Sequence, residues 1–125
     1  MRIIVAGSRT FNRYEYLEDK ILKFIKENNL KLLDIEIISG TANGADKLGE
    51  KFAEKHNVKC IKFPAEWDKL GKQAGFIRNT QMANYAIEND NEGVLFAFWD
   101  GKSHGTKHMI ETARKKGLQV KIFII

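Results

Sequence analysis

Residues 39–46 (SGTANGAD) combine two glycines with hydroxyl and amide side chains, where an apolar run ends and a helical pattern begins. A strand that turns sharply into a helix leaves backbone N–H groups unpaired, and the helix dipole favours an anion beside them. Glycines permit the turn and let a ligand approach the backbone closely. The segment therefore predicts one wall of a phosphate pocket, formed by Gly40, Thr41, Asn43 and Gly44. The alternative is that the two glycines serve only to make the turn.

Two further turns have a similar character. The first follows the apolar residues 2–6 and offers Gly7, Ser8, Arg9 and Thr10. Its arginine could hold a phosphate through two parallel hydrogen bonds, and a surface ion pair is the alternative role. The other turn, at 100–106, places more amide and hydroxyl donors at the start of a helix: Gly101, Ser103, Gly105 and Thr106. Either hydroxyl residue could instead serve only as the helix cap.

Five more residues are candidates for ligand contact. Arg78 and Asn79 lie early in an expected helix and could face the same edge as the three turns. Trp67, Trp99 and His104 could contact a base, with core packing as the alternative for each tryptophan. An exposed histidine without a ligand is the alternative for His104.

Two sequence features are assigned no part in ligand binding. His104 and His108 have the spacing of a helical metal pair, but no carboxylate motif accompanies them, so we expect no metal site. Asp46 is expected to be structural, because a carboxylate in the first turn of a helix complements the helix dipole.

Strand-like and helix-like patterns alternate along the chain, which predicts an α/β fold. The expected strands span residues 2–6, 33–38, 58–63, 94–99 and 119–125, and the expected helices span 14–28, 47–56, 74–87 and 106–116. Such alternation implies a mostly parallel five-stranded sheet with right-handed crossovers and helices on both faces. Ligands bind such sheets beyond the carboxyl ends of the strands, where the strand order reverses. The three glycine-bearing turns all lie on that edge.

Length and composition limit the protein class. A chain of 125 residues with 43% hydrophobic residues suits one domain, residues 1–125. The net charge of +5 suits an anionic ligand, either a small phosphate compound or a nucleic acid. The single cysteine, Cys60, excludes an internal disulfide, and no apolar run is long enough for a membrane span. With no signal peptide evident, we expect a cytoplasmic protein.

The motifs taken together resemble the SLOG superfamily, and more narrowly its YspA/cpYpsA-related branch. They occur in order along nearly the whole chain: Gly7-Ser8-Arg9, residues 39–46, Trp67, the block Ala74 to Ala83, and residues 101–106. The resemblance implies a Rossmann-like three-layer sandwich that binds nucleotides or nucleotide-derived signals at these turns. Members occur in bacteria and phages, often in conflict systems, and relatives often self-associate, so a homo-oligomer is expected.

The function predicted first is binding of a small nucleotide or of an ADP-ribose-like or cyclic signalling ligand, as a sensor or a sequestering protein. We expect no cofactor and no membrane partner. One alternative is the phosphoribohydrolase activity of relatives that cleave nucleoside monophosphates. Arg78 and Met82 match the spacing of one of their motifs and Gly105-Thr106 match another, but Met109 occupies the position of its glutamate.

Hydrolysis through an oxocarbenium-like transition state needs a carboxylate near the ribose, a role that Asp100 could take in place of the missing glutamate. A second alternative is binding of single-stranded DNA, as in the Smf/DprA relatives. The chain lacks a dense basic stripe with interleaved aromatic residues, which ranks nucleic acid below the other two functions.

Overall fold

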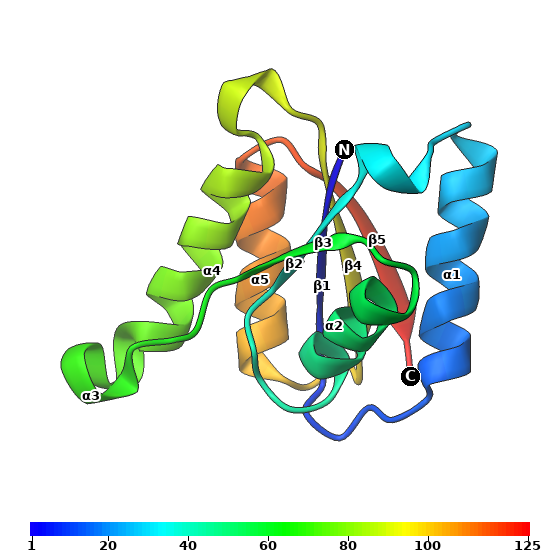
Figure 1. Ribbon diagram of the computed structural model, residues 1–125. Helices are drawn as coiled ribbons and strands as arrows, with labels where there is room; N and C mark the ends of the chain where they lie inside the picture. The colour runs from blue at the N-terminus through cyan, green and yellow to red at the C-terminus, as the bar shows by residue number, and fades with distance from the viewer.

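Five parallel strands form one sheet in the order β3-β2-β1-β4-β5 in the computed structural model, which describes residues 1–125 (Figure 1). The strands are β1 (Arg2–Gly7), β2 (Glu36–Ser39), β3 (Lys59–Lys62), β4 (Gly93–Trp99) and β5 (Gln119–Ile124). The helices are α1 (Tyr14–Glu27), α2 (Ala45–Lys55), α3 (Trp67–Leu70), α4 (Ala74–Ala86) and α5 (His104–Lys115). No helix has both the length and the apolar character needed to cross a bilayer.

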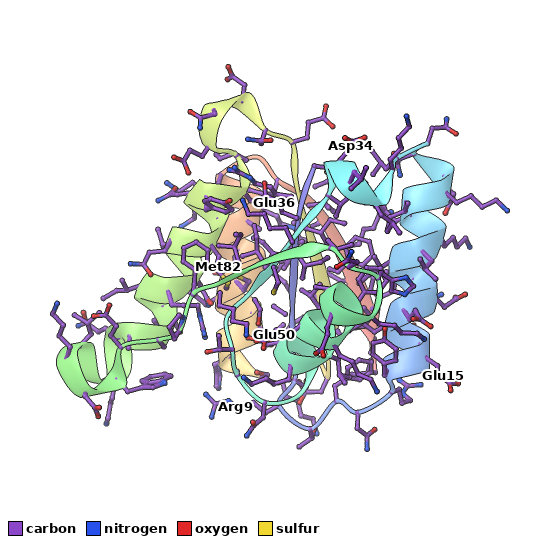
Figure 2. The ribbon with its side chains drawn as sticks, viewed as in Figure 1. Arg9, Glu15, Asp34, Glu36, Glu50 and Met82 are labelled. Carbon is purple, nitrogen blue, oxygen red and sulfur yellow. The ribbon has the colours of Figure 1, made fainter.

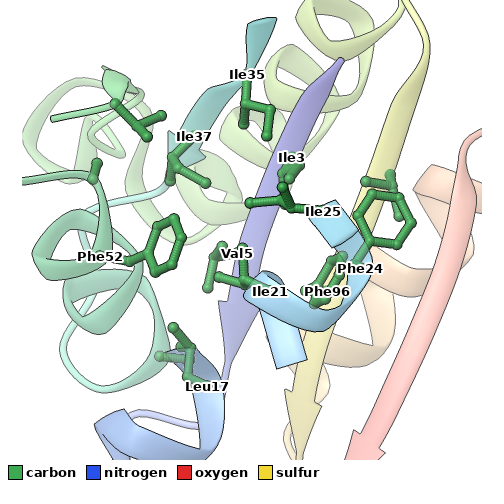
Figure 3. Close-up of a cluster of buried hydrophobic side chains, with 14 of the residues drawn as sticks. Ile3, Val5, Leu17, Ile21, Phe24, Ile25, Ile35, Ile37, Phe52 and Phe96 are labelled. Carbon is green, nitrogen blue, oxygen red and sulfur yellow. The ribbon is translucent and has the colours of Figure 1, made fainter. Parts of the chain in front are cut away.

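The helices cover both faces of the sheet, and each face has its own apolar core. Alternate residues of a strand point to opposite faces, so Ile3 and Val5 of β1 enter one core, while Ile4 and Ala6 enter the other. The first core is completed by α1 and α2 (Figure 3), and the second by α4 and α5. The predicted three-layer α/β fold is confirmed.

The strand order reverses between β1 and β4. The chain runs outward from β1 to β2 and β3 with α1 and α2 on one face, and then returns across the other face through α4 to β4, which pairs with β1. Connections that leave β1 and β4 in opposite directions open a crevice at the carboxyl edge of the sheet. The turns after β1, β2 and β4 gather at this edge, at the bottom of Figure 1.

The helix boundaries agree with the sequence expectation to within two residues, whereas the second strand starts later than expected. Residues Leu32–Asp34 form a 3₁₀ turn, and β2 begins at Glu36. Leu33 is 93% exposed, because it lies on this turn and not in the buried strand that follows it. The expected strand 33–38 is therefore wrong in its first residues. The long connection 64–73 also contains α3, which projects from the body of the molecule beside α4 (Figure 1).

The same leucine-to-alanine substitution at two positions tests which residues form the core. Leu17 of α1 is fully buried in the first core, whereas Leu33 is almost fully exposed. Leu17→Ala should lower the free energy of unfolding by about 2–5 kcal/mol, because it removes buried methyl groups and leaves a cavity. Leu33→Ala should change it by no more than about 0.5 kcal/mol. Urea unfolding followed by circular dichroism measures both, and similar losses would contradict the assigned burial.

Candidate functional site

The turn after β1 packs directly against the turn after β2. Gly44 ends the second turn with a φ of +81°, and a Cβ atom built there would lie 2.2 Å from the carbonyl oxygen of Ser8. The Ala45 N–H donates to the same oxygen at 3.3 Å. Only a residue without a side chain fits this contact, so Gly44 fixes the separation of the two turns.

Ser8 also ties the turn after β4 to the other two. Its N–H donates to the carbonyl oxygen of Phe98 at 2.9 Å, and its Oγ accepts a hydrogen bond from the Asp100 N–H at 3.2 Å. The side chain is buried. Ser8 therefore connects the turn after β4 to the turns after β1 and β2.

Two residues of α4 close the site from the opposite face of the sheet. Arg78 donates from Nη1 to the carbonyl oxygen of Gly40 and from Nε to Oδ1 of Asn79 at 3.1 Å. Buried Asn79 donates from Nδ2 to the carbonyl oxygen of Gly105 at 3.2 Å. A Cβ at Gly40 would lie 2.6 Å from Nη1, so this glycine lets the guanidinium reach the turn. The two side chains connect α4 to the second turn and to the start of α5.

The turns and α4 enclose two adjoining pockets. The inner pocket has a volume of about 70 Å³, and the outer pocket about 290 Å³. Arg9, Ala42 and Arg78 line both. Figure 2 shows Arg9 at the carboxyl edge of the sheet and Met82, which lines the inner pocket, on α4. Both pockets are therefore bordered by two arginines, one from the turn after β1 and one from α4.

Most of the residues proposed from the sequence line these pockets. Besides the two shared arginines, the inner pocket contains Gly7, Asn79, Ser103, Gly105 and Thr106. The outer pocket contains Gly40, Thr41, Asn43 and Trp67. No side chain caps α5, which leaves its first-turn N–H groups free to meet an anion in the inner pocket.

Several proposed residues lie outside both pockets. Ser8 and Gly44 build the contact between turns, and Thr10, Gly101 and His104 are solvent-exposed or partly exposed residues that line neither pocket. Trp99 donates from Nε1 to the carbonyl oxygen of Ser103 at 3.1 Å and packs against the second core. Trp67 does not pack in the core: the residue is 49% exposed and lines the outer pocket. Of the two tryptophans, only Trp67 is placed to meet a base.

Asp100 does not supply a carboxylate to either pocket. Its Oδ1 accepts hydrogen bonds from the N–H groups of Ser103 and Lys102, both at 2.8 Å. These bonds hold the pKa of Asp100 below its usual range. The carboxylate organises the turn before α5, so its suggested role beside a ribose has no support from its position.

Asp46 is a pocket residue that the sequence reasoning missed. It lines the inner pocket, is only 4% exposed, and accepts a hydrogen bond at Oδ2 from the Ala42 N–H at 3.2 Å. Burial raises its pKa to about 6, against the opposing effects of the Arg78 charge and the Ala42 N–H. The sequence does show one unusual feature that could have identified this residue: the carboxylate of Asp46 directly follows a glycine turn whose other residues suit an anion.

The chain is similar to known proteins over nearly its whole length. The model of the family described as "YspA, cpYpsA-related SLOG family" matches residues 1–70, which contain β1 to β3 and the first two turns. The "Gene 61 protein" of Mycobacterium phage D29 is 29% identical over 124 residues, which cover 95% of this chain and 93% of the phage protein. No solved structure matches the chain.

The contact between the first two turns can be tested with two glycines of similar φ. Gly44 and Gly101 have φ of +81° and +80°, but an added Cβ meets Ser8 only at Gly44 and meets nothing within 4 Å at Gly101. Gly101→Ala should cost about 1–2 kcal/mol of stability, the cost of a positive φ. Gly44→Ala should cost at least about 2 kcal/mol more, because of the clash and because a ψ of −128° places Gly44 outside the left-handed helical region that other residues can adopt. Chemical denaturation compares the two variants, and equal costs would refute the close contact.

The pKa of Asp46 predicts how stability depends on pH. Its folded pKa of about 6 lies above the value of about 4 expected in the unfolded chain. Between these two values the folded protein binds more protons than the unfolded chain, so this residue lowers stability as the pH rises. Asp46→Asn removes this pH-dependent loss of stability. The free energy of unfolding of the variant minus that of wild type should therefore increase from about pH 4 to about pH 7. A difference that does not change with pH would contradict the raised pKa.

Proposed function

The chain belongs to the YspA, cpYpsA-related SLOG family, and from this premise we propose that it binds a small nucleotide or nucleotide-derived ligand across the two pockets. The observation that carries the proposal is the position of Arg9 and Arg78, which border both pockets at the edge where the strand order reverses. Open α/β sheets bind ligands at this position.

The inner pocket suits a phosphate group. Arg9 and Arg78 provide positive charge from two directions, and Gly105 and Thr106 lie at the N-terminus of α5, where the helix dipole attracts an anion. One guanidinium group can bind two oxygens of a phosphate through two parallel hydrogen bonds. A volume of about 70 Å³ suits one such group better than a whole nucleotide.

The outer pocket suits the remainder of the ligand. Trp67 borders it, and the edge of this indole lies against Gly75, where a Cβ would be 3.1 Å from Cη2. An exposed indole beside a polar pocket offers a stacking surface for a base. A pyrophosphate passing between Arg9 and Arg78 would connect the two pockets, which favours an ADP-ribose-like ligand over a compact cyclic mononucleotide. In this proposal the protein acts as a sensor of the ligand or sequesters it.

A specific observation also supports the phosphoribohydrolase alternative. Arg78, Met82, Gly105 and Thr106, which match the motifs of that activity, line a single pocket. Met109 places an apolar side chain in this pocket at the position where the motif has a glutamate. Asp46 of α2 brings a carboxyl group to the same pocket. Release of adenine from AMP, detected by chromatography and lost in Asp46→Asn, would establish this activity in place of binding alone.

Arginine substitutions test the binding proposal. Arg9 is exposed and has no side-chain hydrogen bond or ion pair, so Arg9→Ala should leave the fold intact and weaken ADP-ribose binding about 10- to 100-fold. Arg13→Ala is the matched control, because Arg13 packs over Tyr16 and lines neither pocket. Isothermal titration calorimetry on both variants measures the effect. Wild-type affinity in Arg9→Ala, or an equal loss in Arg13→Ala, would exclude this site.

A further inference from the structure

The inner pocket contains a buried acid among groups that suit an anion. Asp46 stands in the first turn of α2, is 4% exposed and lines the pocket together with Arg9 and Arg78. Oδ2 accepts the Ala42 N–H, whereas Oδ1 has no partner in the protein. Because no side-chain polar atom sealed from solvent lacks a partner, Oδ1 must reach solvent, and the pocket that Asp46 lines is the open space beside it. One oxygen of a buried carboxyl group is thus available to a ligand.

The charges around Asp46 come from three elements. Arg78 on α4 and Arg9 after β1 attract the ionised carboxylate, and Glu50 on α2 repels it. Neither arginine forms a direct ion pair with Asp46, since Arg78 donates to Gly40 and Asn79. Glu50 is itself paired with Lys47 and Lys62 and accepts a hydrogen bond from Ser39. Burial outweighs these attractions and leaves the acid able to exchange its proton near neutral pH.

A phosphate in the same pocket would add a second negative charge close to Oδ1. Two ionised oxygens this close repel each other, and a low local dielectric makes the repulsion costly. One proton placed between them replaces the repulsion with a short O–H···O⁻ hydrogen bond, a strong charge-assisted type. Both groups would occupy the same small pocket, whose volume is about 70 Å³.

We propose that Asp46 contacts the ligand phosphate as a neutral acid, donating its proton from Oδ1 to a phosphate oxygen, so that binding takes up one proton from solvent. The proton returns to solvent when the ligand leaves. The inference rests on the proposed function and adds to it a binding residue and a pH dependence. The protein then holds phosphate-bearing ligands more tightly as the pH falls toward 6.

Calorimetry with ADP-ribose tests this step, because its pyrophosphate stays fully ionised near neutral pH and any proton uptake belongs to the protein. Titrations at several pH values, in buffers with different ionisation enthalpies, give both the affinity and the number of protons. For wild type, the dissociation constant should rise about tenfold per pH unit between about pH 6.5 and about pH 8, with uptake approaching one proton.

Asp46→Asn keeps the shape of the side chain and places an N–H donor near Oδ1 without a titrating proton. It should bind ADP-ribose with an affinity that changes less than about threefold over the same range and with no proton uptake. Glu50→Gln is the control, because this carboxylate lies one turn further along α2 and lines neither pocket. It should keep the wild-type slope.

The outcomes separate this inference from the function on which it rests. Binding by wild type without pH dependence, or an unchanged slope in Asp46→Asn, would overturn the role of Asp46 and leave nucleotide binding intact. Failure of wild type to bind ADP-ribose, AMP or cyclic AMP at any pH would overturn both. Carboxyl ¹³C NMR of wild type provides a test independent of the variant: Asp46 should be protonated in the ADP-ribose complex at about pH 7, and an ionised Asp46 would refute the proposal.

Discussion

The contact between the turn after β1 and the turn after β2 is the constraint on which the candidate site depends. Gly44 lies against the carbonyl of Ser8, and Ser8 in turn binds the backbone at Phe98 and Asp100 after β4. Parallel pairing of β2, β1 and β4 brings the three turns to one edge, and these contacts hold them against one another. The glycine and the serine therefore act as structural parts of the site.

The return of the chain across the second face of the sheet supplies the remaining wall. Because α4 crosses from β3 back to β4, its first turns pass over the carboxyl edge, where Arg78 reaches Gly40 and Asn79 reaches Gly105. The Arg78 guanidinium is held by hydrogen bonds to the protein and borders both pockets. Arg9 has no such bonds. One positive group is thus fixed in place, and the other is free to adjust to a ligand.

An acid inside this basic pocket changes what the pocket can do. Two arginines and a helix N-terminus alone would attract any small anion, with little dependence on pH near neutrality. Asp46 adds a group whose charge depends on its surroundings, because burial opposes ionisation while the arginines favour it. In the binding mode that we propose, the balance between these two effects decides whether Asp46 repels an anion or shares a proton with it.

The sequence by itself determined the alternation of strands and helices, the three turns on one edge of the sheet, and the family. The structure confirms the predicted fold, and the family model confirms the predicted family. These features are local, since periodicity and turn glycines depend on neighbours along the chain. The local pattern failed at Leu33, which lies in a 3₁₀ turn before β2 and is exposed there. Only the tertiary structure decided that Trp67 and not Trp99 borders a pocket, and that Asp46 lines the inner pocket. The physical reason is that the positive charge of Arg78 comes from α4, an element distant in the sequence, and no local pattern around residue 46 records that approach.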